Sequence, residues 1–333
     1  MYSPQMVMKS PTEVKINYET AAVPTQGAIQ PIANLVRDTA LVNRHDMMST
    51  KPDGHPFVYR CAVTLSPVAK DNGSGHADAF FTESESGVTY SLDDVEYRLR
   101  LLGVGKNWVY REGSKKVVKA REQMYRSAGV KKSDRGAYDK HIRYCWATGS
   151  ESYLSPLNGA GSAFTGGSWE VSKLIFPDDT TGAHICLQGT HATEESNVSF
   201  TTLSLPQLYL SSRNQVRADS NNDVTDQPAD SSVLMKLLSP NYMGSNDEVI
   251  DLARDNQDNP PYDLDQDGDA CEARELGRIH IGQRSGIQST MIVDIPFGIC
   301  QFDVQAFNRK DTEDGETVTP VHIGVEILSI YPM

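Results

Sequence analysis

The chain has few cysteines and lacks a long apolar run. No stretch of its 333 residues approaches the about 20 apolar residues of a membrane-spanning helix, and its first residues contain no signal-peptide core. We therefore expect no membrane association. The cysteines are odd in number, scattered and without CxxC spacing, which disfavours a zinc site or a disulfide framework and favours buried free thiols. They are Cys61, Cys145, Cys186, Cys271 and Cys300.

The motifs of common enzymes are also missing. The sequence contains no phosphate-binding GxxxxGK[ST], no dinucleotide-binding GxGxxG, no zinc-binding HExxH and no nucleophile motif GxSxG. The eight histidines are dispersed, and we interpret His184 and His191 as packed or surface side chains that flank a strand. We expect that the chain is not an enzyme. A hydrolase whose site is assembled from distant residues is one alternative.

Charge is unevenly distributed along the chain, which has a formal net charge of −13. Fourteen Lys or Arg residues lie between Arg98 and Arg143, against four acidic residues in the same interval. The rest of the chain is more acidic, especially residues 219–275. Such asymmetry indicates the kind of partner and surface, because net charge governs association more than fold.

Alternating or β-branched runs predict about eight strands. They lack the strand–helix rhythm of a parallel sheet, so we predict an all-β fold, an antiparallel jelly-roll β-sandwich with a helical insertion. A double jelly roll is the alternative, because 333 residues could hold two small sandwiches. The predicted strands cover residues 57–65, 87–90, 169–176, 184–188, 198–203, 278–281, 289–295, 299–304 and 321–330.

The strands divide the chain into an arm and one domain. Residues 1–55 are proline-containing and show little periodicity, which predicts an extended N-terminal arm. Residues 56–333 would form the jelly-roll domain. Within it we expect a basic helical insertion at 106–146 and an acidic, partly helical segment at 215–276. In the insertion, helical spacing predicts one helix over 115–126 that stops at Gly129 and a second over 134–144.

The basic insertion is the candidate nucleic-acid site. Clustered Lys and Arg bind phosphates through the release of counterions, and interspersed aromatic rings can stack on unpaired bases. The aromatic candidates are Tyr110, Tyr125, Tyr138 and Trp146. The alternative is a solvated helical face that pairs with acidic neighbouring subunits. The candidate cations are Lys106, Arg111, Lys115, Lys116, Lys119, Arg121, Arg126, Lys131, Lys132 and Arg135.

An acidic loop is a candidate calcium site. Five carboxylates alternate with other residues around a glycine, a pattern that can surround one Ca²⁺ ion. The loop does not match a true EF-hand, because its twelfth position holds Arg274 instead of a glutamate. The run is similar to the DxDxDGxxCE element of small extracellular calcium-binding modules. The alternative is a solvent-exposed acidic turn. The candidate ligands are Asp263, Asp265, Asp267, Asp269 and Glu272.

Several motifs in a shared order resemble capsid proteins of environmental, bacilladnavirus-like circular single-stranded DNA viruses. The resemblance covers roughly residues 115–270, about half of the chain. The segments are Ala120-Arg-Glu-Gln-Met-Tyr-Arg-Ser-Ala-Gly129, Gly166-Gly-Ser-Trp-Glu-Val-Ser-Lys-Leu-Ile-Phe-Pro177, Leu205-Pro-Gln-Leu-Tyr-Leu-Ser-Ser-Arg213, Asp247-Glu-Val-Ile-Asp-Leu-Ala-Arg-Asp-Asn256 and Pro260-Pro-Tyr-Asp-Leu264.

The resemblance implies a jelly-roll subunit that assembles with many copies of itself into an icosahedral shell around a genome. The expected partner is genomic nucleic acid, single-stranded DNA above all, and the expected location is the virion. One departure is the arm, whose first fifty residues hold four cations instead of an Arg/Lys-rich tail. A shell that holds its genome through a separate packaging protein is therefore an open alternative. The alternative function is a calcium-dependent β-sandwich binding module.

Overall fold

A computed structural model describes a large part of the chain, including both halves of the expected domain. Every structural statement below refers to these residues alone. They are residues 13–24, 28–67, 70–71, 77–78, 81–82, 89–90, 95–136, 139, 141–149, 151–175, 182–189, 192–193, 200–211, 273–282, 288–308, 317–318 and 320–333.

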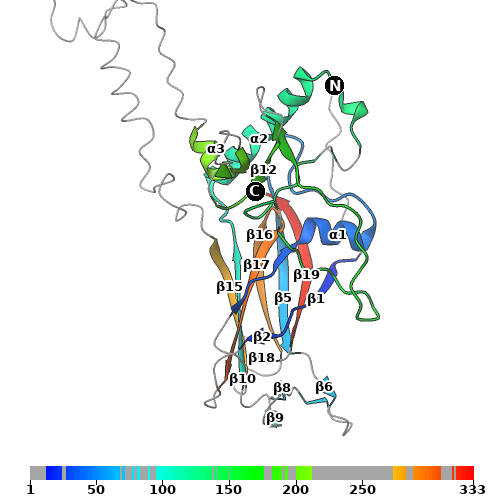
Figure 1. Cartoon of the computed structure of the whole chain (residues 1–333), viewed down its shortest axis with the longest axis vertical. Coiled ribbons are helices and arrows are strands. Elements are labelled where there is room, and N and C mark those ends of the chain that lie inside the picture. The colour runs from blue at the N-terminus through cyan, green and yellow to red at the C-terminus, as the bar shows by residue number, and fades with distance from the viewer. Residues whose placement is uncertain are drawn as a thin grey trace, which may run out of the picture.

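Four antiparallel strands form the first sheet of a β-sandwich (Figure 1). The order across the sheet brings distant parts of the sequence together, since Tyr18 lies opposite Ile323 and Val63 lies opposite Val325. The strands, in sheet order, are β1 (Lys15–Glu19), β19 (Val321–Pro332), β5 (Phe57–Pro67) and β16 (Ser289–Pro296).

The second sheet is also antiparallel. Its edge next to β17 is formed by two short strands that both pair with β17. When β3 and β4 are counted as one, the first sheet contains the first, eighth, third and sixth strands of the sandwich, and the second contains the second, seventh, fourth and fifth. The strands, in sheet order, are β15 (Arg274–Ile281), β10 (Val95–Gly103), β17 (Ile299–Asn308) and β3 (Ala28–Ile29) with β4 (Ile32–Asn34).

The two sheets share one apolar core. In β5, Cys61, Val63 and Leu65 are fully buried while the residues between them are more exposed, because side chains alternate between the faces of a strand. Tyr18 of the first sheet packs against Phe302 of the second, with 6.2 Å between ring centroids. The predicted all-β, antiparallel fold class is therefore confirmed, and the described strands build one sandwich and several small sheets.

The N-terminal region is more regular than its sequence predicts. Residues 1–55 contain β1 and β3–β4 in the two sheets, and helix α1 (Leu35–Asn43). Asn34 caps α1 by accepting the backbone N–H of Arg37. The expectation of an irregular arm misses α1, because the helix has only nine residues and derives its order from tertiary packing.

A tight turn closes the sandwich at the same end as α1. Phe297 and Gly298 join β16 to β17 and both have positive φ, which glycine adopts without strain but phenylalanine rarely does. The backbone N–H of Phe297 donates to the carbonyl of Phe57 at 2.8 Å. Its fully buried ring packs against Tyr144 with 4.9 Å between centroids. The turn therefore anchors the residues of the long insertion to the sandwich.

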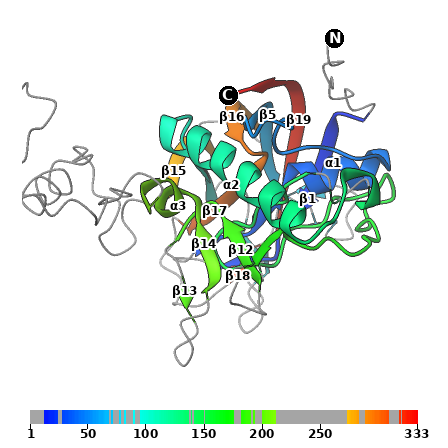
Figure 2. The ribbon, with the colours of Figure 1, turned by 90° about the horizontal axis from the view of Figure 1, so that it is seen from above.

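The insertion between β10 and β15 lies across this end of the sandwich. Figure 2 shows α2 crossing over the strands, with α3 and β12 beside it. Its apolar side chains form a second core, which includes Val117, Tyr144, Leu205 and Phe297. Its described elements are α2 (Trp108–Ser127), the 3₁₀ helix η1 (Lys132–Asp134), β11 (Lys173–Ile175), β12 (Gly182–Cys186), β13 (Ala192–Thr193), β14 (Phe200–Ser204) and α3 (Leu205–Ser211).

Two predictions for the insertion need correction. The helix predicted over 134–144 is absent from the described residues there, since η1 ends at Asp134 and none of the described residues from there to 144 is α-helical. The strand predicted over 169–176 is shortened to β11. By contrast, the helix predicted over 115–126 is present within the longer α2. Of the acidic segment 215–276 the structure describes only 273–276, where β15 begins.

Short two-stranded pieces lie at the opposite end of the sandwich (Figure 1). They pair β2 with β18, β6 with β7 and β8 with β9. Their bounds are β2 (Val23–Pro24), β18 (Thr317–Val318), β6 (Lys70–Asp71), β7 (Ala77–Asp78), β8 (Phe81–Thr82) and β9 (Thr89–Tyr90), the last within the strand predicted over 87–90.

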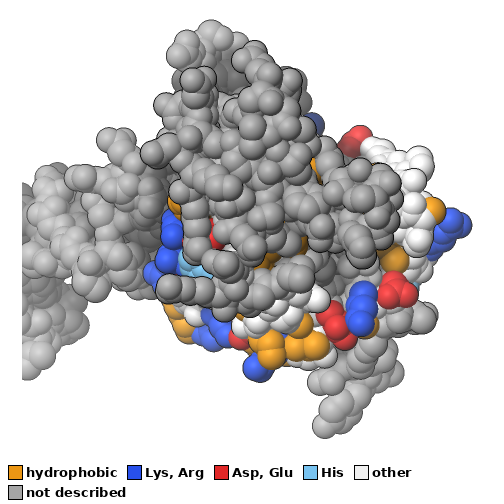
Figure 3. Space-filling model, turned by 90° about the horizontal axis from the view of Figure 1, so that it is seen from below, with side chains coloured by type: hydrophobic (Ala, Val, Ile, Leu, Met, Phe, Trp, Pro, Cys, Tyr) orange, Lys and Arg blue, Asp and Glu red, His pale blue; other side chains and the backbone are white. Residues whose placement is uncertain are grey.

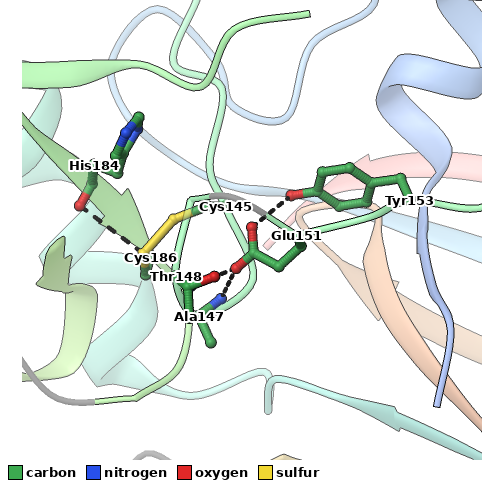
Figure 4. The surroundings of a disulfide bond; sticks show 7 residues. All are labelled: Cys145, Ala147, Thr148, Glu151, Tyr153, His184 and Cys186. Carbon is green, nitrogen blue, oxygen red and sulfur yellow. Dashed lines mark hydrogen bonds between the residues drawn. A yellow bond between two sulfur atoms is a disulfide. The ribbon is translucent and has the colours of Figure 1, made fainter.

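The cysteines do not all remain free thiols. Cys145 and Cys186 form a disulfide that joins the chain after η1 to β12 (Figure 4). Cys61 and Cys300 are buried free thiols, as predicted, and burial raises the pKa of each thiol. Cys271 lies outside the described residues. The prediction fails for the disulfide pair because 41 residues separate the two cysteines, and only the fold brings their Cα atoms to 4.6 Å.

Candidate nucleic-acid interface

Helix α2 presents the basic insertion on a rigid element. The Asn107 side chain caps its start by accepting the Tyr110 backbone N–H at 3.1 Å. At its end Gly129 has φ +75°, and the backbone N–H groups of Gly129 and Val130 donate to the carbonyls of Arg126 and Tyr125. This pair of hydrogen bonds is a Schellman motif, which confirms the predicted helix stop.

Two of the ten candidate cations are buried. The side chain of Arg121 is 5% exposed and that of Arg135 is 4% exposed. Arg121 pairs with Asp139 at 2.7 Å, and Arg135 pairs with Glu122 at 2.9 Å. Both guanidinium groups also lie over the Tyr125 ring, at 5.1 and 4.5 Å from its centroid. These two arginines hold the chain after α2 against the helix, so we remove them from the candidate interface.

Four further candidates carry partners at the surface. Lys106 pairs with Asp294 of β16 at 2.6 Å, and this hydrogen bond raises the pKa of Lys106. Arg111 and Lys115 both contact Glu112, at 3.2 and 2.9 Å. Burial favours a higher pKa for Glu112, but the bonds and charges of Lys115 and Arg111 outweigh burial and hold the pKa below its usual value. Lys132 lies 3.7 Å from Glu122.

The remaining four candidates form an exposed basic surface. Lys116, Lys119 and Arg126 recur at spacings of three and seven residues, so they share one side of α2, and Lys131 follows the helix end. In the described part of the chain, Lys119, Arg126 and Lys131 make no ion pair. Residues 106–136 carry ten cations and three carboxylates, a net charge of +7. This excess positive charge suits a polyanion.

Trp108 is an exposed aromatic residue beside these cations that could stack on a base. It is not among the aromatic candidates predicted from the sequence. Its side chain is 56% exposed, its indole N–H donates to the Tyr209 hydroxyl at 2.9 Å, and the Arg111 guanidinium lies 4.4 Å from the ring. The Lys116 ammonium lies 5.4 Å from the Tyr209 ring. The position of Trp108 directly after the helix cap is the sequence signal that could have identified it.

The aromatic residues expected to stack on bases lie elsewhere. Tyr110 and Trp146 are buried in the second core, and Tyr125 lies between two arginines. Tyr138 lies outside the described residues. An aromatic side chain within a helix of this kind is exposed or buried according to its angle around the helix axis. Trp108 points outward and Tyr110, two positions later, points inward.

A second group of arginines lies on the outer face of the second sheet, but carboxylates balance it. Arg98 lies opposite His280 and Arg100 opposite Arg278 across β10 and β15. Figure 3 shows Lys and Arg side chains beside a histidine on its left flank, the side on which β15 lies. Arg100 pairs with the buried Asp303, and Arg278 pairs with Glu275 at 2.7 Å. This face therefore lacks the excess charge of α2. The paired carboxylates are Asp303 and Glu275.

The calcium prediction is not tested by the described residues. All five candidate ligands, from Asp263 to Glu272, lie outside them. Within the described ranges, no three His, Cys, Asp or Glu side chains cluster in a way that could hold a metal ion. Likewise, no helix in the described part of the chain is long and apolar enough to cross a membrane. Comparison of the chain with family models, curated proteins and solved structures finds no match.

Proposed function

We propose that this protein is the coat subunit of a small virus, which assembles with copies of itself into a closed shell around nucleic acid. The observation that carries the proposal is the strand order of the sandwich. One sheet contains the first, eighth, third and sixth strands and the other contains the second, seventh, fourth and fifth. This order is the one expected of two interleaved Greek keys, so it supports a jelly roll, the architecture of many viral capsid subunits.

The interior of the sandwich supports a structural role. Jelly rolls also occur in lectins and cupins, so the order of strands alone does not select a function. Here the space between the sheets is filled by buried apolar side chains, including Tyr18, Leu99, Phe302 and Val325. A large part of the chain instead forms the insertion at one end of the sandwich, and this insertion carries the basic surface of α2.

Among the described strands, the outer strands of the sandwich have an unpaired edge that favours association with further copies. Strands β1 and β16 are the outer strands of the first sheet, and β15 is an outer strand of the second. Exposed strand edges invite pairing or packing with another chain, and a closed symmetric assembly covers them. The disulfide between Cys145 and Cys186 also suits a particle that persists outside the reducing cytosol.

The partner inside the shell would be nucleic acid held by α2. Lys116, Lys119 and Arg126 would contact phosphates, and Trp108 would offer an exposed ring to an unpaired base. The proposal predicts salt-dependent binding, because each phosphate contact releases counterions. Calcium binding by the acidic loop remains a separate prediction.

Particle formation is the decisive test of the shell. The purified full chain is examined by negative-stain microscopy and light scattering, with Ca²⁺ and with a chelator. Uniform closed shells are the expected result, and their loss on chelation would support calcium at residues 263–272. A protein that stays monomeric in every condition would overturn the shell and favour a calcium-dependent binding module.

Nucleic-acid binding is tested separately by salt titration with a single-stranded DNA oligonucleotide. The double variant Lys119→Gln/Arg126→Gln should bind more weakly and show a salt slope that is smaller by about 1.4, because each phosphate contact on a single strand contributes about 0.7. The matched control Lys15→Gln/Arg60→Gln removes two exposed cations from the first sheet, with side chains 64% and 55% exposed. Equal loss in both variants would contradict a role for the α2 surface.

A further inference from the structure

A cavity of 880 Å³ lies beside α1, outside the basic surface of α2. Its walls come from the end of α1, from the chain between Arg143 and Trp169, and from the start of β11. Its volume falls within the range of about 300–1,000 Å³ that is typical of sites for small ligands. The charged and aromatic residues that line it and that carry the following argument are Arg44, Arg143, Lys173, Tyr153, Phe164 and Trp169.

Arg143 is a partly buried cation, and the charges of Asp139, Glu170 and Asp46 act on it without a direct ion pair among the described residues. Its guanidinium lies over the Trp169 ring, 5.3 Å from the centroid. Its Nε atom is buried and has no hydrogen-bond partner, and within the described residues its side chain makes no ion pair. Burial lowers the pKa of Arg143. Leaving a charge partly desolvated and unpaired is costly, so an anion that entered the cavity would gain a strong partner.

Three of the four neighbouring carboxylates bind other groups. Both backbone N–H groups of Ala147 and Thr148 donate to Glu151, whose other oxygen accepts the Tyr153 hydroxyl at 3.5 Å (Figure 4). Asp139 pairs with Arg121. Asp46 lies 3.0 Å from His141. Glu170 lines the cavity but makes no ion pair with Arg143.

Two more cations line the same cavity without an ion pair in the described part of the chain. Arg44 follows the last residue of α1 in a left-handed conformation, with φ 53°, and is exposed. Lys173 lies at the start of β11 and is also exposed. Arg37 lines the cavity as well, but it pairs with Asp38. Arg44, Arg143 and Lys173 outnumber the carboxylate of Glu170, which is unpaired among the described residues. This excess favours an anion with more than one charge, which a phosphate monoester carries at neutral pH and a single carboxylate does not.

The aromatic residues that line the cavity indicate what the uncharged part of the ligand is. Tyr153, Phe164 and Trp169 are each partly exposed and all line the cavity. Aromatic side chains offer flat apolar surfaces on which another ring can stack. We propose that this cavity binds a phosphate monoester that carries a flat ring, the chemistry of a nucleoside monophosphate. The site is separate from α2 and does not depend on the proposed shell.

Calorimetric titration of the full chain with adenosine 5′-monophosphate tests the proposal. Binding is expected, with inorganic phosphate and adenosine each binding more weakly, because each supplies half of the chemistry. The substitution Arg143→Gln should weaken binding by about tenfold or more. Arg44→Gln at the exposed rim should weaken it by a smaller factor and cannot disturb the core, so it decides the question if the first variant fails to fold.

Arg60→Gln is the matched control, since it removes an arginine with a 55% exposed side chain from the first sheet and should leave the affinity unchanged. No detectable binding of the nucleotide at millimolar concentration would overturn the proposal. Equal affinity for adenosine and its monophosphate would also overturn it, because the cations would then have no role. An equal loss in Arg60→Gln and Arg143→Gln would also overturn it, because the effect would then follow from overall charge and not from the cavity.

Discussion

The hydroxyl of Tyr18 donates a hydrogen bond to Oδ2 of Asp38 at 2.6 Å, and both side chains are fully buried. Tyr18 belongs to β1 of the first sheet, and Asp38 belongs to α1. The other carboxylate oxygen accepts a hydrogen bond from Nε of Arg37 at 2.7 Å. This contact fixes α1 to the sandwich, and it does so through a buried acid, which is costly unless every lone pair is satisfied.

Removing the hydroxyl should weaken this connection. We expect Tyr18→Phe to lower the free energy of unfolding by about 2 kcal/mol, the typical loss for a hydrogen bond to a charged group. Chemical denaturation measures the change. The control is Tyr331→Phe, whose hydroxyl contacts Lys106 at 3.4 Å and bonds to Asp294 at the surface, where solvent can replace both contacts. Its loss should therefore cost much less stability. Equal effects of the two variants would contradict a structural role for the Tyr18 hydroxyl.

Asp38 should make the folded protein more stable as the pH falls, which is the opposite of the usual effect of a carboxyl group. Burial raises the pKa of Asp38 to about 6, although the charge of Arg37 and the Tyr18 hydrogen bond act in the opposite sense. A carboxyl whose pKa is raised in the folded state contributes stability that is fully present below its ordinary pKa of 3.8 and is lost as pH rises through about 6. The contribution is on the order of 3 kcal/mol.

The comparison that isolates this effect is wild type against Asp38→Asn. Between pH 7 and pH 4 the stability of the wild type should rise relative to the variant, since only the wild type takes up a proton at this position. Unfolding free energies across this pH range measure the difference. A constant difference between the two proteins would show that Asp38 does not change its protonation in this interval.

The buried arginines of α2 should affect stability rather than nucleic-acid binding. Arg121→Gln leaves Asp139 without its partner, and we expect a loss of about 2 kcal/mol, less than for a fully buried pair because Asp139 is 35% exposed. Lys119→Gln should change stability by less than about 0.5 kcal/mol. Denaturation and oligonucleotide binding measured on both variants should show opposite patterns.

The disulfide should stabilise the insertion. The loop closed between Cys145 and Cys186 spans 41 residues, and replacing both cysteines by alanine should cost about 3 kcal/mol. A reductant should lower the thermal midpoint of the wild type and leave the double variant unchanged. Wild-type midpoints that are the same with and without reductant would mean that the bond is not formed in solution.

The strands were the most predictable part of the molecule. Residues 321–327 place an apolar side chain at every second position, and β19 forms there with the corresponding alternation of burial. Helix α2 was also predictable, because its apolar spacing and Gly129 are local signals. Helix α1 was not, because it is short and most of its stability comes from contacts such as Tyr18–Asp38.

The candidate site was predictable in composition and not in geometry. A helical projection shows that Arg121 follows Val117 by four residues, on the buried side of α2, so its burial had a sequence signal. Arg135 had none, because its burial depends on how the chain folds back after Gly129. The exposure of Trp108 depends on α3, about one hundred residues later, whose Tyr209 accepts its N–H.

The sequence by itself determined the β-rich class, the position of the basic helix and the separation of basic and acidic segments, because these depend on local periodicity and composition. The tertiary structure decided which strands are neighbours, which cysteines pair and which cations of α2 are buried in ion pairs. Those outcomes depend on contacts between residues far apart in the chain, such as Arg100 with Asp303 and Cys145 with Cys186. The sequence pattern specifies on which face of a helix or strand a side chain lies. Only the tertiary fold specifies which other residues contact that side chain.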